Sequence, residues 1–232
     1  MPPAEGGGME INMNEYKIAF IICTNNELYC NECIYYLSQL VVPEGYEIDI
    51  LTIHDATGIN AAYNEALRES DAKYKVYLHQ DLFIINKNFI VDILDIFKDA
   101  KIGMIGFAGI EKAKDFFING WRWTKGKPYV DAVNIAYALD FGKVQDKYER
   151  VQAIDGMCMV TQYDLSWREE KYTGWHFYDF VHSMEFLQNG YEIVVPNQEK
   201  PWMIHDHGII SYAQYNYWLK VFMDEYKEYI NK

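Results

Sequence analysis

The stretch His54–Asp81 reads HDATGINAAYNEALRESDAKYKVYLHQD and holds one helix between the ends of two strands. The first strand is expected over Glu47–Ile53, and the second over Tyr74–Leu78. Gly58 marks the turn that leads into a helix predicted for Ile59–Ser70. A strand, a helix and a strand in this order form a βαβ unit, whose two strands run parallel in one sheet.

Acidic residues follow both strands of this unit. Asp55 comes directly after the first strand, and Asp81 closes the second in the motif His79-Gln80-Asp81. Ligands of open α/β sheets bind at the carboxyl ends of the strands, so we expect both aspartates to face one crevice. Two acids at that place indicate a polar ligand together with a metal ion.

The same alternation of strands and helices continues on both sides of this unit. Lys17–Cys23 (KIAFIIC) and Ile102–Phe107 are short apolar runs, as expected of strands buried on both faces. Asn88–Phe97 has apolar residues at helical spacing. The order β-α-β-α-β-α-β predicts an α/β fold with a nucleotide-binding layer.

The length and composition favour one folded domain. The chain has 232 residues, half of them apolar, and no linker rich in Pro, Gly or Ser divides it. We expect a single domain over residues 13–232, after a flexible extension, Met1–Asn12, that is small, polar and rich in glycine.

The charge and hydropathy exclude several partners. With 34 acids and 21 bases, the formal net charge is −13, which disfavours binding to nucleic acid. No apolar run approaches the ~18 to 20 residues of a transmembrane helix, and no signal-peptide pattern opens the chain. These features predict a soluble, cytoplasmic protein.

The alternation stops between Ala108 and Gln152. A loop there contains Trp121 and Trp123, which either form a platform for the apolar face of a sugar ring or plug the loop onto the core. An alternating stretch near Tyr129–Leu139 predicts a hairpin.

Three later segments carry further polar candidates. Val151–Thr161 reads as a strand with Asp155-Gly156 at its centre, where glycine often marks a close approach. A helix predicted for Phe177–Gln188 has Asp179 in its first turn. Farther on, His205-Asp206-His207 forms a dense polar cluster. The last helix, 212–230, has an aromatic stripe that packs either on this domain or on a second copy in a homodimer.

The order of these motifs resembles the family-two glycosyltransferases of the GT-A fold, and among them the streptomycin-biosynthesis-type branch. The resemblance runs from Lys17 to Gly208 and depends on four elements in register. They are Thr24-x-Asn26, His54-Asp55, the segment Gly58–Asn64 and the motif His79-Gln80-Asp81. It implies a three-layer α/β/α fold with a mostly parallel central sheet, and transfer of a sugar from a nucleotide-diphosphate donor to an acceptor hydroxyl.

The resemblance also implies roles on the donor side. Asp55 matches the carboxylate that contacts the nucleotide base or ribose, and Thr24, Asn26, Asn64 and Gln80 fall in the donor-binding motifs. Asp81 matches the ligand of the divalent ion that bridges the diphosphate. A Lewis acid there offsets the charge on the leaving group by several kcal/mol, and an aspartate is ionised at neutral pH.

The resemblance bears on histidines in two places: His79 departs from the family's motif, whereas His205–His207 matches a late segment from which family members often place a histidine on the metal. His79 replaces the first acid of the usual Asp-x-Asp motif, and it either binds the ion, contacts the donor phosphate or packs at the strand end. An imidazole in the site suits Mn²⁺ at least as well as Mg²⁺. Of the later pair, His207 is preferred to His205 as a further ligand because it adjoins Gly208. The alternative is that both are surface histidines.

The resemblance also implies roles on the acceptor side, in and before the helix predicted for Phe177–Gln188. Asp179 matches the family's catalytic base, although an acid in a first turn also stabilises the helix dipole. Asp155-Gly156 matches the segment beside the bound sugar or, alternatively, is a bulge in a strand. Trp175 could stack on the acceptor or the donor.

Two other functions remain open at this stage. The altered His79-Gln80-Asp81 motif also fits a non-catalytic module that binds nucleotide sugars. A metal-dependent hydrolase built on His205-Asp206-His207 has less support, because no bridging acid motif lies near it.

Overall fold

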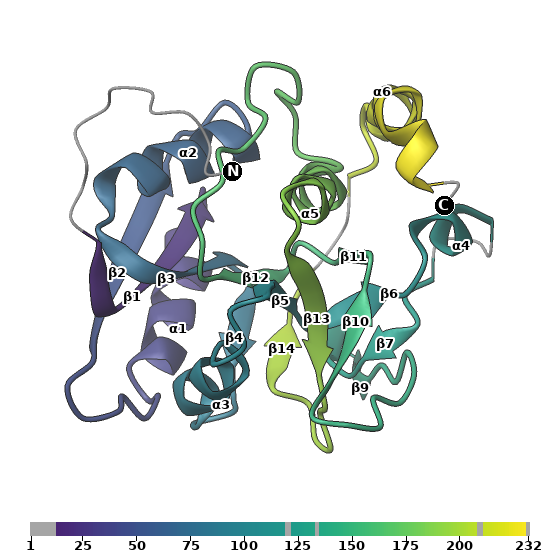
Figure 1. Cartoon of the computed structure of the whole chain (residues 1–232). Coiled ribbons are helices and arrows are strands. Elements are labelled where there is room, and N and C mark those ends of the chain that lie inside the picture. The colour runs from purple at the N-terminus through teal and green to yellow at the C-terminus, as the bar shows by residue number, and fades with distance from the viewer. Residues whose placement is uncertain (1–12, 119–121, 133–134, 208–210, 231–232) are drawn as a thin grey trace.

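A computed structural model describes residues 13–118, 122–132, 135–207 and 211–230, so the predicted extension Met1–Asn12 lies outside the described residues. A seven-stranded sheet in the order β10-β13-β5-β12-β3-β1-β2 forms its centre (Figure 1). Its strands are β1 (Asn14–Thr24), β2 (Glu47–His54), β3 (Ala72–His79), β5 (Ile102–Gly106), β10 (Tyr148–Val151), β12 (Cys158–Thr161) and β13 (Glu192–Pro196).

The strands of this sheet do not all run in the same direction. β1 pairs in parallel with both β2 and β3, as the βαβ pattern predicts. β12 runs antiparallel to β3 and β5, and β10 runs antiparallel to β13. The sheet is therefore mixed, with most of its strands in one direction.

The strand predicted over Val151–Thr161 is interrupted in the structure. Its first part is β11 (Ala153–Ile154), which belongs to a small sheet with β6 (Ala108–Ile110) and β7 (Lys125–Gly126). Its second part is β12, in the central sheet. Asp155 and Gly156 form the connection between two sheets, so placing them at the centre of one strand was wrong.

A further small sheet brings distant segments together beside the central one. It has the order β4-β14-β8-β9 and contains β4 (Leu82–Ile84), β14 (Met203–His205), β8 (Tyr129–Ala132) and β9 (Ile135–Ala138). β8 and β9 form the hairpin predicted near Tyr129–Leu139. β4 begins directly after Asp81 and pairs with β14, so the end of β3 lies beside a segment from far along the chain.

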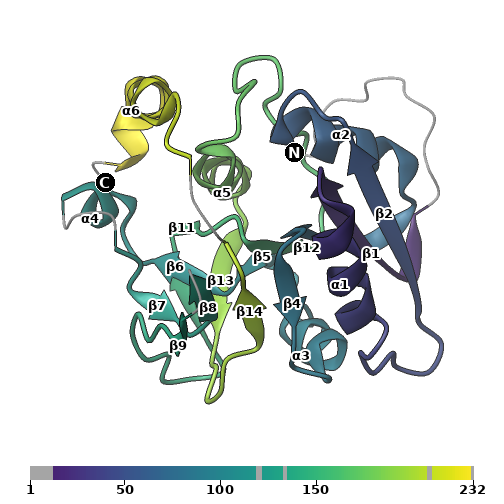
Figure 2. The same cartoon turned by 180° about the vertical axis from the view of Figure 1, so that it is seen from behind.

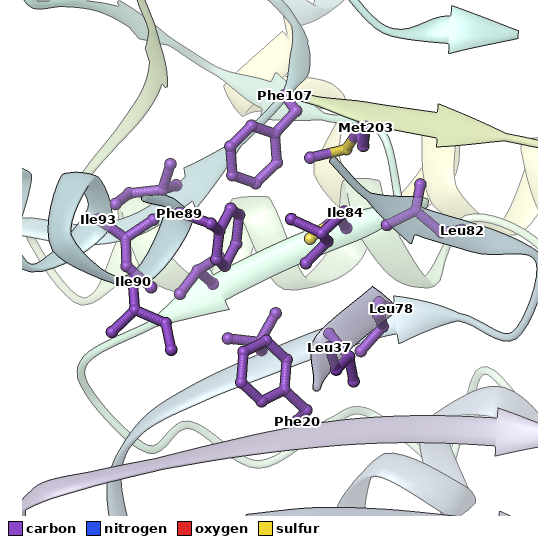
Figure 3. Packing of buried hydrophobic residues seen from close by; sticks show 14 of the residues in the cluster. Phe20, Leu37, Leu78, Leu82, Ile84, Phe89, Ile90, Ile93, Phe107 and Met203 are labelled. Carbon is purple, nitrogen blue, oxygen red and sulfur yellow. The ribbon is translucent and has the colours of Figure 1, made fainter. Parts of the chain in front are cut away.

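The helices cover both faces of the central sheet, as Figure 2 shows from behind. They are α1 (Glu27–Leu37), α2 (Ile59–Glu69), α3 (Phe89–Ile96), α4 (Ala113–Ile118), α5 (Tyr178–Gln188) and α6 (Tyr215–Ile230). Alternate residues of β1 face opposite sides: Phe20 packs with α1 and α3 (Figure 3), and Ile21 packs with α2 and α5. This is the predicted three-layer α/β/α arrangement.

The last helix packs on the chain itself. The buried aromatic residues of α6 lie against α5, so the stripe packs on this domain, as one of the two alternatives had it. These residues are Trp218, Phe222 and Tyr226, and they contact the cluster that contains Phe180 and Met184. None of the helices in the described residues combines the length and the apolar character needed to cross a bilayer.

Candidate active site

A cavity of about 510 Å³ opens where β1, β2 and β3 end. It collects residues from six separate segments of the chain. Its lining consists of Cys23, Thr24, Asn25, Asp55, Ala56, Ile59, His79, Gln80, Asp81, Asp155, Gly156, Trp175, His176, Tyr178, Asp179, His205 and His207. The structure thus brings all four predicted aspartates of the sequence, together with His207, to one cavity.

One end of the cavity holds a cluster of three residues whose ligand atoms could share a metal ion. His79 Nδ1 lies 3.2 Å from His205 Nε2 and 4.0 Å from Asp81 Oδ1, and His205 Nε2 lies 3.5 Å from the same oxygen. The pairing of β14 with β4 explains the proximity, because it places His205 opposite Leu82, next to Asp81. We call this cluster the ion end of the cavity.

The dimensions of the ion end fit a metal ion. A point equidistant from the three atoms lies about 2.1 Å from each, which is the length of a metal–imidazole bond. Burial, followed by the neighbouring His205, lowers the pKa of His79, so its imidazole is neutral and can donate a lone pair. Burial would raise the pKa of Asp81, but a hydrogen bond from His205 and the nearby imidazoles lower it, so this carboxylate is ionised.

The preference for His207 over His205 as the third member of this cluster is not supported. His205 contributes the clustered nitrogen, whereas His207 lies beyond the end of β14 and lines the cavity. Their rings are 5.5 Å apart. The H-x-H spacing pointed to this segment, but which of its two histidines joins the cluster depends on the register between β14 and β4.

Asp179, at the start of α5, also lines the cavity. Its carboxylate accepts hydrogen bonds from the backbone N–H of Gly156 (3.1 Å) and of Phe180 (2.9 Å). Burial, together with the charge of Asp155, raises the pKa of Asp179 to about 7, against the effect of these hydrogen bonds. We call Asp155 and Asp179 the base end, because a carboxyl with this pKa can take up a proton at neutral pH.

Asp55 lies at the exposed rim of the cavity, after β2. Its φ of 53° is in the left-handed region, which a non-glycine residue seldom adopts and which is often found at binding sites. The turn after β2 therefore brings Asp55 to the lining of the cavity.

Gln80, Thr24 and Asn26 have structural partners that the sequence does not reveal. The Gln80 carbonyl oxygen accepts hydrogen bonds from the Thr24 hydroxyl (2.7 Å) and from the backbone N–H of Asn25 and Asn26. Asn26 is the N-cap of α1 and does not line the cavity. These bonds hold the ends of β1 and β3 together. Thr24 and Gln80 also line the cavity, so their donor contacts stay a prediction.

Two other predicted site residues, Asn64 and Trp123, pack away from the cavity. Asn64 is buried outside the cavity, and its amide forms two hydrogen bonds of 2.8 Å with the backbone of Trp167. Trp123 packs on Phe116 and Phe180, so it plugs its loop onto the core, while Trp121 lies outside the described residues. Gly156 lines the cavity, and the Tyr178 hydroxyl occupies the position that a Cβ at this residue would need, so its place beside a bound sugar stays a prediction.

Trp175 is half exposed, at 51%, on the rim near the base end. Sequence reasoning passed over Tyr178, which lines the cavity between the two ends and contacts His79. Its only signal was its position beside Asp179. Among the described residues that line the cavity there are four aspartates and no lysine or arginine.

Comparison with solved structures places this architecture among the GT-A glycosyltransferases. TarS of S. aureus is similar over 90% of this chain and 39% of its own, with 14% identity and a TM-score of 0.56. Its fragment 1–349 in complex with UDP is similar over 86% of this chain, with 14% identity and a TM-score of 0.53. A Drosophila galactosyltransferase 7 mutant, in complex with manganese, UDP-Gal and xylobiose, has 11% identity over 86% of this chain and 73% of its own, with a TM-score of 0.51.

The family follows from the sequence itself. Residues 19–226 match a glycosyltransferase-like family, to which the chain therefore belongs. No curated protein matches it significantly. The chain spans 62% of the length of the TarS fragment. At these identities the structural likeness defines the fold, whereas the streptomycin-biosynthesis-type branch stays a prediction.

Proposed function

We propose that the chain is an inverting, metal-dependent glycosyltransferase that moves a sugar from a nucleotide-diphosphate donor to an acceptor hydroxyl. One observation carries the proposal. A single cavity in a chain of this family holds a His-Asp-His cluster at one end and a carboxyl with a pKa near 7 at the other. These two ends correspond to the two needs of the reaction, a stabilised leaving group and a proton acceptor.

The ion end would hold the metal through His79, Asp81 and His205. When bound, a divalent cation supplies Lewis acidity to the diphosphate of the leaving group. No lysine or arginine among the described lining residues can take that role, and four aspartates would repel a diphosphate. We therefore infer that donor binding depends on the ion. Two imidazoles favour Mn²⁺ over Mg²⁺, which prefers an all-oxygen set.

The donor would lie between the rim and the ion end. We assign Asp55 to the nucleotide base or ribose, because it is exposed at the end of β2, and Cys23, Ala56 and Ile59 offer an apolar surface nearby. TarS has been crystallised with UDP and UDP-GlcNAc, and the galactosyltransferase with UDP-Gal. Those ligands support a nucleotide-sugar donor here.

The acceptor would approach from the base end. Asp179 accepts the proton of the acceptor hydroxyl as its oxygen attacks the anomeric carbon in line, which inverts the configuration there. Asp155 tunes Asp179 through its charge, and Trp175 is placed to stack on the acceptor.

A panel of UDP-, GDP-, CMP- and dTDP-sugars tests the proposal. With Mn²⁺, one donor should raise the melting temperature and release its nucleoside diphosphate in a turnover assay, and neither effect should occur without the ion. Binding without turnover against any acceptor would instead assign the chain to a non-catalytic nucleotide-sugar-binding module.

A further inference from the structure

Tyr178 connects the two ends of the cavity. It begins α5, directly before Asp179, and its side chain is buried beside Tyr63 and Trp167. Its hydroxyl lies 2.5 Å from Nε2 of His79. The other nitrogen of the same ring, Nδ1, faces His205 and Asp81. The two nitrogens of His79 therefore have separate surroundings, a phenol on one side and the ion end on the other.

We propose that Tyr178 is a positioning residue for the metal ligand His79. A neutral imidazole that binds an ion through Nδ1 carries its proton on Nε2, and that N–H donates to the Tyr178 hydroxyl oxygen. The hydrogen bond fixes both the tautomer and the orientation of the ring, as outer partners of metal-bound histidines do. This inference rests on the proposed metal-dependent function and adds a residue to it.

The surrounding backbone holds Tyr178 in this place. Phe177, the residue before it, has a φ of 64°, in the left-handed region, which sets the direction in which α5 begins. A Cβ at Gly156 would overlap the Tyr178 hydroxyl, so only glycine leaves room for it there. The N–H of the same glycine binds the Asp179 carboxylate. One short connection therefore positions the residue that orients the ion ligand as well as the proposed base.

Tyr63 offers a matched control. It is fully buried in the same aromatic cluster, with its ring centroid 6.2 Å from that of Tyr178. Its hydroxyl has no hydrogen-bond partner in the described part of the chain. Removing the hydroxyl from Tyr63 or from Tyr178 is the same chemical change in the same core, but only the second change affects an ion ligand.

The experiment compares Mn²⁺ binding by the full-length wild type, Tyr178→Phe and Tyr63→Phe, measured by electron paramagnetic resonance without donor. We expect Tyr178→Phe to weaken binding about 10-fold or more, and Tyr63→Phe to leave it unchanged. Equal affinity of Tyr178→Phe and wild type would overturn the inference and leave the proposed function intact. A wild type that binds no Mn²⁺ would instead refute the metal dependence, and this inference with it.

A second measurement needs the wild type alone and decides the matter if Tyr178→Phe does not fold. Long-range ¹H–¹⁵N correlations of the ¹⁵N-labelled, Zn²⁺-loaded protein distinguish a protonated ring nitrogen from a metal-bound one. For His79 we expect the proton on Nε2 and the ion on Nδ1. A proton on Nδ1 would overturn the inference.

Discussion

The two ends of the cavity place aspartates in opposite environments. At the ion end, Asp81 lies beside two imidazoles, and its pKa is lowered despite burial. At the base end, Asp179 is partly buried next to another carboxylate, and this burial, followed by the charge of Asp155, raises its pKa to about 7. The same side chain is thus prepared as a permanent anion in one place and as a proton acceptor in the other. The difference teaches that neighbours decide which acid binds a cation and which takes up a proton.

The largest expected effect separates the two ends directly. Asp179→Asn removes the proton acceptor but keeps an oxygen of similar shape, so transfer should fall about 100-fold or more. The affinities for Mn²⁺ and donor should stay as in the wild type, because the ion end is untouched. Steady-state transfer and calorimetric donor titration measure both. Transfer at the wild-type rate would remove Asp179 from its role.

Asp81→Asn should give the complementary result. The ion end loses its only carboxylate, and loss of a direct ligand should cost more than the roughly 10- to 100-fold that outer partners cost. Mn²⁺ affinity is read from electron paramagnetic resonance, and donor affinity from calorimetry in the presence of the ion. If donor still binds tightly, the inferred dependence of donor binding on the ion is wrong.

The pH dependence of transfer should report the base end. Asp179 acts only when deprotonated, and its pKa is about 7. kcat/KM should therefore fall about tenfold for each pH unit below 7 and level off above 8. A profile that is flat from pH 5 to 8 would contradict this assignment.

Stability offers an independent check on the same group. The folded-state pKa of Asp179 lies above the unfolded value of about 3.9, so its contribution to the free energy of unfolding decreases as the pH rises from about 4 to 7. Asp179→Asn avoids this loss. After allowance for the partly exposed side chain, it should be about 1 kcal/mol more stable than the wild type at pH 8 and no more stable at pH 4. Denaturant unfolding at the two pH values measures the difference.

The smallest effect on the cavity is expected from Asn64→Ala. Within the described part of the chain its amide bonds only the Trp167 backbone, so the substitution leaves two buried groups unpaired and should cost roughly 2 kcal/mol of stability. Donor affinity should not change, because Asn64 does not line the cavity. A selective loss of donor affinity in a folded variant would restore its predicted donor role.

The site residues that could be predicted from the sequence are those in the regular alternation of strands and helices. Asp55 and Asp81 could be placed from the sequence because each follows a strand of a βαβ unit, and parallel strands end at the same edge. Asp179 could be placed from its first-turn position. β4 and the reversal of β12 were missed, because short strands and their pairing leave little periodic signal.

The partners of polar side chains cannot be read from motif positions. Polar residues such as Asn64, Gln80 and Asn26 occur in motif positions, but their side chains also bond to the backbone. Asn64 and Gln80 bond to distant segments, and Asn26 caps its own helix. Strand register decides that His205, and not His207, joins the cluster. The role of Tyr178 depends on its contact with His79, which is 99 residues away in the sequence. Neither spacing nor composition contains that information.

The pairing of β14 with β4 has a consequence for how the fold opens. His79 and His205 are 126 residues apart, and their segments meet through a three-residue ladder beside the central sheet. A cation held between them binds only when these two segments are paired, so it stabilises the folded state by mass action. A bound metal would then cross-link an early and a late segment of the polypeptide. Amide hydrogen exchange in β4 and β14 should slow when it is bound.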